Sequence, residues 1–433
     1  MKTTTRYIIF LTASLILCCI PCKAQNKSGG VCLSLWKNIA TQPSDTTQTT
    51  YLNLGIVSSL HQLKGIGLNV FGSFASNSVY GIQVSGLSNI AGGSMKGIQL
   101  SGLTNINGDE AAGFIGSGIA NVTGNNLHGI GVSGLMNITG NNVKALLVSG
   151  MMNITGTTTT GVSIAGILNI EGGGMSKGIK MGGIGNIIGS DLSGVAVGGL
   201  MNISGNNTNG IQIASLTNIS GGQTSGIQLS GLANISVHAK GLQIAGLGNV
   251  AQSLHGVQIG IYNRADFATD GVQIGIVNKS KSSAAAKFGL VNVNPDTRYQ
   301  LMVYGGNTTK TNVAMRFKNK LFYTILGLGS HYFDFDKKIS ASAFYRTGLG
   351  FDIAKNLFLS GDLGYQHIET FHNKYEENIP ERMYALQARI NLEYHLTEKF
   401  GVFASGGYDV TRYYSKNKTF EDKPIVELGI VLF

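Results

Sequence analysis

The sequence predicts an all-β protein, in which a glycine-rich β-solenoid of about 14 coils of ~16 residues precedes a small antiparallel β-barrel of about eight strands. Three observations lead to this prediction. Ten-residue blocks that end near an asparagine recur about every 16 residues through the middle of the chain. The last third of the chain instead alternates apolar and polar residues in long runs, as β-strands do. Glycine accounts for 62 of 433 residues, which disfavours helices, because each interior glycine costs about 1 kcal/mol relative to alanine.

Residues 1–24 have the layout of a cleaved secretory signal peptide. Two basic residues precede an apolar run over 7–20, and Cys22 and Ala24 supply the small residues of a cut before Gln25. The run is too short for a helix that spans a membrane. A lipoprotein signal is the alternative, because three cysteines crowd the cut, although none follows the small residue that lipoprotein processing prefers.

Only Cys32 remains after that cut, so the mature chain is expected to form no intramolecular disulfide and no cysteine-based metal site. Removal of the signal lowers the formal net charge from +10 to +7, because three basic residues and no acid leave with it. Charged residues are sparse in the repeats. No basic cluster with interleaved aromatics occurs, which argues against a nucleic-acid partner.

The repeat array is expected to span residues 49–297, after a linker over 25–48. Its block reads GIQLSGLTNI at Gly97 and GIQLSGLANI at Gly226, and it shortens to GVQIGIYN at Gly256. Hexapeptides of turn composition, such as TGNNLH, separate the blocks. Every copy carries one asparagine, and these are Asn89, Asn105, Asn121, Asn137, Asn153, Asn169, Asn186, Asn202, Asn218, Asn234, Asn249, Asn263, Asn278 and Asn292.

Two architectures fit such a block. In a β-solenoid each repeat is one coil, with Ile98 and Leu100 expected to point inward, a bend at Gly102, and Leu103 expected to point inward on the next face. In a barrel each block is one membrane strand, for which about 9–11 residues suffice. The solenoid is favoured, because a lipid-facing strand keeps its apolar residues on one face, whereas Leu103 falls on the face that carries Gln and Ser.

The recurring asparagines also have two readings. They form either a row of ligand groups on an exposed face or a structural ladder, in which each side-chain amide bonds the equivalent amide one coil away. The ladder is favoured, because every copy keeps its asparagine whatever the neighbouring residues are.

The shortest form of the block, at Gly256–Asn263 and Gly271–Asn278, resembles the spirochaete-type surface repeat, which is also met in exported proteins of gut Bacteroidota. The resemblance covers a little over half of the chain, and the earlier copies depart from it by one inserted residue. It implies a location in the cell envelope. The family has no established activity and no functional residues to carry over.

Residues 298–433 are expected to form an outer-membrane β-barrel. From Tyr384 to Leu396 every second residue is apolar, and the alternate positions carry mostly polar groups. The inward-facing groups expected to form an ion-pair network are Arg346, Asp362, Arg389 and Glu393. A soluble β-sandwich packed on the array is the alternative.

The chain ends at Phe433, and a terminal aromatic resembles the signature by which outer-membrane barrels are recognised for assembly. The match is imperfect, because Glu427 and Gly429 share the parity of Phe433 along the last strand. The prolines agree with the division into strands, because Pro295 and Pro424 fall at a junction and a strand start.

Little in the sequence indicates chemistry. The histidines are scattered without a metal-site motif, the repeats supply only stray carboxylates, and no phosphate-binding loop occurs, so no catalytic, metal or cofactor residue is expected. We expect a non-enzymatic protein in the outer membrane of a Gram-negative-type cell. Its expected partners are outer-membrane lipid, the barrel-assembly machinery and a protein or glycan. The alternative is a transport protein, in which the repeats and the C-terminal strands form one large barrel.

Overall fold

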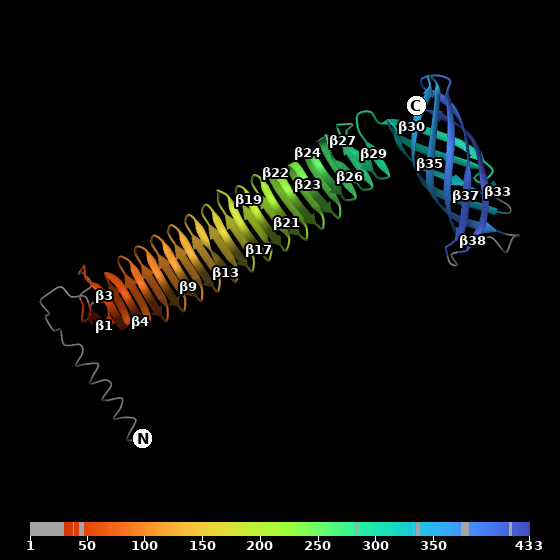
Figure 1. Ribbon diagram of the computed structural model, residues 1–433. Helices are drawn as coiled ribbons and strands as arrows, with labels where there is room; N and C mark the ends of the chain where they lie inside the picture. Colours follow the sequence, from red (N-terminus) through yellow and green to blue (C-terminus); the bar gives the residue numbers. More distant parts are fainter. Residues whose placement is uncertain are drawn as a thin grey trace. The chain divides into compact units, whose positions relative to one another are not determined.

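Figure 1 shows the computed structural model, which is all-β wherever it is described. It describes residues 30–37, 39–42, 47–282, 284–331, 333–334, 338–373, 381–414 and 418–433. The predicted signal peptide, residues 1–24, lies outside these ranges. The described residues include no helix of the length and apolarity that a membrane crossing requires. The chain divides into two compact units, Met1–Gln243 and Ile244–Phe433.

The first unit is a stack of short strands, and most coils contribute one long and one short strand. Their bounds are β1 (Val31–Trp36), β2 (Ile39–Ala40), β3 (Thr49–Leu60), β4 (Gln62–Ala75), β5 (Val79–Ser85), β6 (Ser88–Ala91), β7 (Met95–Ser101), β8 (Thr104–Asn107), β9 (Ala111–Ser117), β10 (Ala120–Thr123), β11 (Leu127–Ser133), β12 (Met136–Thr139), β13 (Val143–Ser149), β14 (Met152–Thr155), β15 (Thr159–Ala165), β16 (Leu168–Glu171), β17 (Ser176–Gly182), β18 (Gly185–Ile188), β19 (Leu192–Gly198), β20 (Met201–Ser204), β21 (Thr208–Ala214), β22 (Thr217–Ser230) and β23 (Ala233–Ala245).

Successive coils lie in register, and each strand pairs in parallel with its equivalent one coil away. In the long strands, Gly97 of β7 lies opposite Gly113 of β9, and in the short strands, Asn105 of β8 lies opposite Asn121 of β10. Barrel strands joined by short turns pair antiparallel instead. The repeats therefore form a β-solenoid of about 15 turns, as predicted, and the alternative in which they are barrel strands is wrong.

The stack begins earlier than the repeat pattern indicated. β1 lies inside the segment expected as a linker, residues 25–48, and pairs in parallel with β3, with Val31 opposite Leu52. β2 pairs antiparallel with β1, with Ser34 opposite Ala40, and so covers the edge of the first coil.

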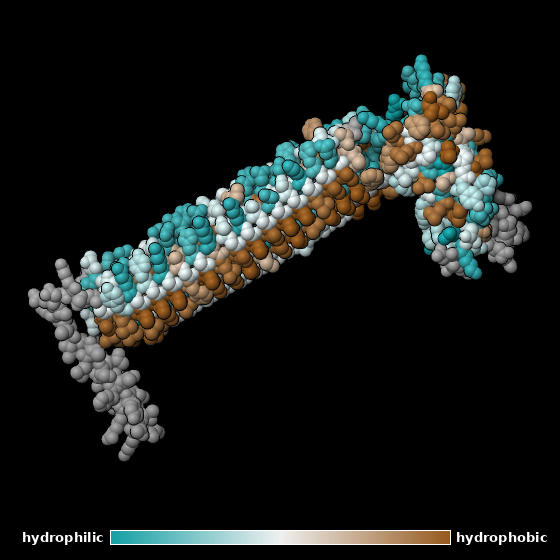
Figure 2. All heavy atoms as spheres, viewed as in Figure 1, coloured by the Kyte–Doolittle hydropathy of each residue, from teal (hydrophilic) through white to brown (hydrophobic). Residues whose placement is uncertain are grey.

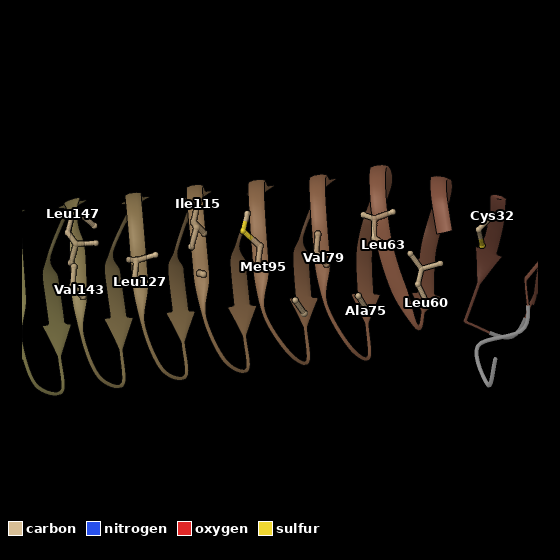
Figure 3. Close-up of a cluster of buried hydrophobic side chains, with 13 residues drawn as sticks. Cys32, Leu60, Leu63, Ala75, Val79, Met95, Ile115, Leu127, Val143 and Leu147 are labelled. Carbon is tan, nitrogen blue, oxygen red and sulfur yellow. The ribbon is translucent and has the colours of Figure 1, made fainter. Parts of the chain in front are cut away.

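The side chains inside the coils are the opposite of those expected. Ile98, Leu100 and Leu103 are 39%, 36% and 41% exposed, whereas Gln99 is fully buried. The prediction that these three aliphatic residues point inward is wrong. The apolar core is instead a row that lies four residues before the glutamine position, supplemented by a few others, and Figure 3 shows its first members, among them Leu63, Val79, Met95, Leu127 and Val143.

The second unit contains the last coils and the barrel strands. The coil strands are β24 (Gly248–Ile259), β25 (Tyr262–Ala268), β26 (Val272–Ile274), β27 (Val277–Ser280), β28 (Ala286–Phe288) and β29 (Val291–Val293). The barrel strands are β30 (Arg298–Gly306), β31 (Thr311–Asn319), β32 (Phe322–Ser330), β33 (Phe333–Asp334), β34 (Lys338–Ala354), β35 (Leu357–Asn373), β36 (Arg382–His395), β37 (Phe400–Tyr413) and β38 (Thr419–Leu432).

Eight of these strands close into an antiparallel barrel. β30 pairs with β38, where Leu301 lies opposite Leu432, and β32 pairs with β34, where Gly329 lies opposite Ser342. The short β33 pairs only with β34. The predicted architecture, a solenoid followed by a small closed barrel, is confirmed.

Candidate functional site

The fourteen repeat asparagines are brought together in hydrogen-bonded ladders within both units. In the first unit, Asn89 Nδ2 donates to Asn105 Oδ1 at 3.0 Å, and the same bond repeats coil by coil to Asn234. In the second unit, the row runs from Asn249 to Asn292 with bonds of 2.9 Å. All fourteen side chains are buried, so they present no row of ligand groups to solvent.

Most ladder amides also bind a main-chain carbonyl beside the bend of the next coil. Asn137 Nδ2, for example, donates to Val148 O at 2.9 Å. At Gly134 the bend leaves no room for a side chain, because a Cβ added there would lie 1.9 Å from Gly118 O of the previous coil. Most coils carry glycine at this position, and Ser215 takes it in one coil. The asparagine and the glycine of the repeat therefore both allow tight bends to stack directly on one another: the amide hydrogen-bonds adjacent coils, and the missing side chain lets their backbones approach.

A second buried ladder, of glutamines, was not predicted. Gln99 Nε2 donates to Gln83 Oε1 at 2.9 Å, and Gln228 Nε2 donates to Gln212 Oε1 at 2.7 Å. The signal was present in the sequence, because glutamine recurs at one position of the block. A buried amide needs a hydrogen-bond partner, and the equivalent amide one coil away supplies it. The polar side chains therefore occupy the interior, and their aliphatic neighbours on the strand face outward.

Two lysines take the glutamine position. Lys180 forms an ion pair with Glu171 at 3.3 Å inside the coil, and burial lowers the pKa of the lysine in spite of the carboxylate. Lys287 has only a long bond to Ala285 O at 3.4 Å, and burial lowers its pKa to about 8. Gln273 Oε1, one coil before Lys287, has no hydrogen-bond donor. Lys287 is therefore a weak point of the glutamine row.

An apolar surface follows the bends of the first unit. Its central row holds the residue after each bend position, ten residues from Leu87 to Leu232, of which Ile167 is half-buried. The other nine side chains are 37–44% exposed: Leu87, Leu103, Ile119, Leu135, Met151, Ile184, Leu200, Leu216 and Leu232. The outward residues of the flanking strands, such as Ile98, Leu100 and Ile106, extend it on both sides. Figure 2 shows hydrophobic residues gathered along this side of the coils and hydrophilic residues along the opposite side. We call this surface the bend edge.

A row of basic residues runs parallel to the bend edge on the long strands. Lys64, Lys96, Lys144 and Lys177 are exposed, and their strands hold them in register, two residues before an outward aliphatic position. From Lys64 to Ser225 the positions of this row include no acidic residue. One face of the bend edge is therefore bordered by positive charge.

The interior of the barrel holds buried ion pairs. Arg316 pairs with Glu393 at 2.7 Å, and Glu427 pairs with Arg389 at 3.0 Å and with Arg346 at 3.7 Å. All five side chains are at most 3% exposed. The predicted network thus exists as two separate groups, and it includes Arg316 and Glu427, which were not predicted.

Asp362, which was expected in the ion-pair network, has neutral partners instead. It accepts hydrogen bonds from Tyr323 Oη at 3.1 Å and from Asn391 Nδ2 at 2.7 Å. The hydroxyl and the amide lie on strands that do not neighbour one another in the barrel, β32 and β36. These contacts cross the barrel and fill it with side chains.

The outward face of the barrel is apolar. Leu328, Leu363, Ile390 and Leu428 are each 67–68% exposed. β36 shows the alternation clearly, because its outward positions carry leucine, isoleucine and tyrosine, while Gln387, Arg389, Asn391 and Glu393 point inward. This polarity is the reverse of that of a soluble barrel.

Phe433 lies just beyond β38 and does not project from the outward face. Its ring packs edge-on against His395 at 5.0 Å between centroids and contacts a buried cluster inside the barrel. Its main-chain N–H donates to Lys399 O at 3.1 Å. Glu427 lies six residues before Phe433 on the same face of the last strand, as the sequence indicated, and it also points into the barrel.

The described residues contain no group of three or more His, Cys, Asp or Glu side chains that could hold a metal ion. Comparison with known proteins assigns the chain to no family, because no family model and no curated protein matches it. Among solved structures, it is similar to the crystal structure of Ail, the attachment invasion locus protein of Yersinia pestis. The sequence identity is 17%, the TM-score is 0.19, and the match covers 31% of this chain and 92% of that chain. A likeness this low carries no argument about function.

Proposed function

We propose that this chain is a non-enzymatic outer-membrane protein, in which the barrel anchors the β-solenoid as a scaffold on the periplasmic side. The observation that carries the proposal is the inverted polarity of the barrel. Leu363 and Ile390 are each 67% exposed, whereas Arg346 and Glu427 are 2% and 1% exposed. Hydrocarbon outside the barrel removes the apolar face from water, and closure of the sheet satisfies the strand backbones without solvent.

The barrel interior supports an anchor and not a channel. An eight-stranded barrel is just wide enough for its inward side chains to fill it. Here Arg346, Tyr323 and Phe358 are among the largest fully buried side chains, and the ion pairs of Glu427 and Glu393 join strands across the interior. A transport role would need an aqueous lumen, so we expect no stable single-channel current from the full chain in a planar bilayer.

The lengths of the strand connections support a periplasmic solenoid. Barrels of this class have short periplasmic turns and longer external loops. The barrel begins at Arg298 and ends at Leu432 on the same side, and the connections on that side are residues 320–321, 355–356 and 396–399. The connections on the other side are residues 307–310, 331–337, 374–381 and 414–418. The solenoid precedes Arg298, so it belongs to the side with short turns.

An epitope tag tests this arrangement. A tag between Asn206 and Asn207, in the loop that joins β20 and β21, is expected to be labelled only after the outer membrane is permeabilised. A matched tag within residues 374–380, between β35 and β36, is expected to be labelled on intact cells. Labelling of the solenoid tag on intact cells would contradict the proposal and would favour a solenoid on the cell surface.

The scaffold role implies partners that the solenoid contacts along its length. Outer-membrane lipid surrounds the barrel in this proposal, and the barrel-assembly machinery inserts it. The solenoid then offers its loops and its bend edge to a protein or glycan. Its interior is filled by the amide ladders and by buried apolar side chains, so any partner binds on the outside.

A further inference from the structure

We propose that the bend edge of the solenoid lies on a phospholipid bilayer, with its aliphatic side chains at the boundary between headgroups and acyl chains. The lipid leaflet is the occupant that this apolar surface fits best. Its size, its curvature and the basic row beside it lead to this inference.

The size of the bend edge calls for an occupant. Ten coils from Leu87 to Leu232 contribute to it, and a coil spacing of about 4.8 Å gives a length of about 45 Å. With the outward rows on both flanking strands the surface covers on the order of 600 Å², which is the upper end of what a soluble monomer leaves exposed. A continuous apolar strip of this size marks an interaction site.

The curvature of the bend edge favours lipid over a second copy of the chain. Leu100 lies on the long strand, Leu103 at the bend and Ile106 on the short strand, and they are 36%, 41% and 37% exposed. The apolar surface therefore wraps around a convex edge. Two convex edges contact each other only along a line, whereas a fluid lipid surface closes around one edge from both sides.

The basic row has the position that a lipid surface requires. Lys96 precedes Leu100 by four residues, which is about 13 Å along the strand. Interfacial elements bury their apolar face about 5–10 Å deep, so the lysine side chains reach back to the level of the lipid phosphates. Lys64, Lys144 and Lys177 occupy the same position on their coils. Anionic phospholipid is therefore expected to strengthen the contact.

This inference rests on the proposed function in one respect, because the barrel would keep the solenoid close to a bilayer. Only residues 294–297 connect β29 to β30. A tether this short raises the effective concentration of the solenoid at the membrane, so a weak affinity per coil suffices.

Depth-dependent quenching tests the inference on the full chain. In a Cys32→Ser background, an environment-sensitive fluorophore is placed on Leu135→Cys at the bend edge, or on Asn141→Cys in the loop at the opposite side of the coils. The chain is reconstituted in phosphatidylcholine–phosphatidylglycerol vesicles that contain spin-labelled phospholipid, and vesicle flotation is measured first. We expect the label at 135 to be quenched at least about threefold more strongly than the label at 141.

Two double variants separate the apolar contribution to lipid binding from the electrostatic one. Leu103→Glu with Leu200→Glu, both at exposed positions of the bend edge, is expected to reduce quenching at 135 to the level at 141. Lys96→Gln with Lys144→Gln is expected to reduce it only in vesicles that contain phosphatidylglycerol.

The outcomes are distinct. Equal quenching at 135 and 141 in a chain that floats overturns the inference and leaves the proposed function standing. A label at 135 that is shielded in a concentration-dependent way in detergent, but is not quenched in vesicles, shows that a second copy covers the bend edge and also overturns it. A chain that does not float overturns the proposed function together with the inference.

Discussion

Replacement of Asn137 by alanine tests whether the amide ladder holds the solenoid together. Asn137 is 1% exposed, and its Nδ2 donates to Asn153 Oδ1 and to Val148 O, both at 2.9 Å. Its Oδ1 accepts from Asn121 Nδ2 at 2.9 Å. Alanine removes these three bonds and a longer one from Nδ2 to Gly131 O at 3.3 Å, and it leaves Asn153 Oδ1 without its ladder donor.

The cost follows from the partners that lose their bonds. Asn121 Nδ2 keeps its bond to Val132 O at 2.8 Å, so that donor is not orphaned. A buried acceptor that loses its donor costs about 1–3 kcal/mol, and the bond lost at Val148 O adds about 1 kcal/mol. The free energy of opening these coils is therefore expected to fall by about 2–4 kcal/mol.

Amide hydrogen exchange of the full chain in detergent is the suitable assay, because a repeat array opens locally and a global melt would dilute the effect. Exchange in the coils around Asn137 is expected to accelerate about 30- to 900-fold. Asn141→Ala is the matched control, because Asn141 lies exposed in the next loop, and it is expected to change the rate by no more than about twofold. Equal effects of the two variants would refute the structural role of the ladder.

Three further variants probe other parts of the molecule. Lys287→Gln is expected to stabilise the last coils by supplying a donor to Gln273 Oε1. It also removes a pH dependence. Burial lowers the pKa of Lys287 in the folded state from its ordinary 10.5 to about 8, so the native lysine makes stability rise with pH across that window. The free energies of unfolding at pH 7 and pH 10 should therefore differ less in the variant. Gly134→Ala places a Cβ 1.9 Å from a carbonyl oxygen and is expected to disrupt the coils, which circular dichroism would detect as a loss of β signal. At Gly173 a Cβ meets nothing within 4 Å, so Gly173→Ala is expected to leave the spectrum unchanged, and equal spectra of the two variants would contradict this reasoning. Glu427→Gln leaves Arg389 and Arg346 without their carboxylate partner and is expected to lower the free energy of unfolding of the barrel by about 3–5 kcal/mol. On gels, the folded barrel band should be lost at a lower temperature, and an unchanged temperature would count against the buried ion pairs.

Much of the fold could be predicted from the sequence. The change of parity between Leu100 and Leu103 excludes a single flat strand, and the recurrence of the block indicates stacked coils. The start of the stack could not be predicted in this way. β1, Val31–Trp36, lacks the glycine and asparagine of the block, and it is recognisable as a coil strand only through its pairing with β3.

Which face of each strand is buried was the larger error, and its cause is physical. Alternation shows that Ile98 and Gln99 lie on opposite faces, but it does not say which face is inside. Burial of the aliphatic side chain is the usual outcome. Here some consecutive coils offer an equivalent amide at the same position, so Gln99 is satisfied by Gln83 and can be buried at little cost. Other coils bury an apolar side chain at this position, such as Ile115 or Leu147.

The pairs inside the barrel could be predicted only as a set of inward groups. Arg389 and Glu427 lie on β36 and β38, which are not neighbours in the sheet, so their contact depends on how the barrel closes. The sequence contains no measure of that distance. The alternation of apolar and polar residues along each strand does, however, indicate that both side chains face the interior.

The solenoid and the barrel pair their strands over different separations in sequence, and this difference affects the order in which they can fold. A coil of the solenoid pairs only with the coil sixteen residues away, as Asn105 does with Asn121. The barrel closes only when Leu301 meets Leu432, from the opposite end of the domain. Contacts between close neighbours in sequence form fast, and distant ones form slowly. If the chain becomes available from its N-terminus onward, each coil can therefore pair with the coil before it as soon as its own residues are present. The barrel cannot close until the last strand, β38, is present as well.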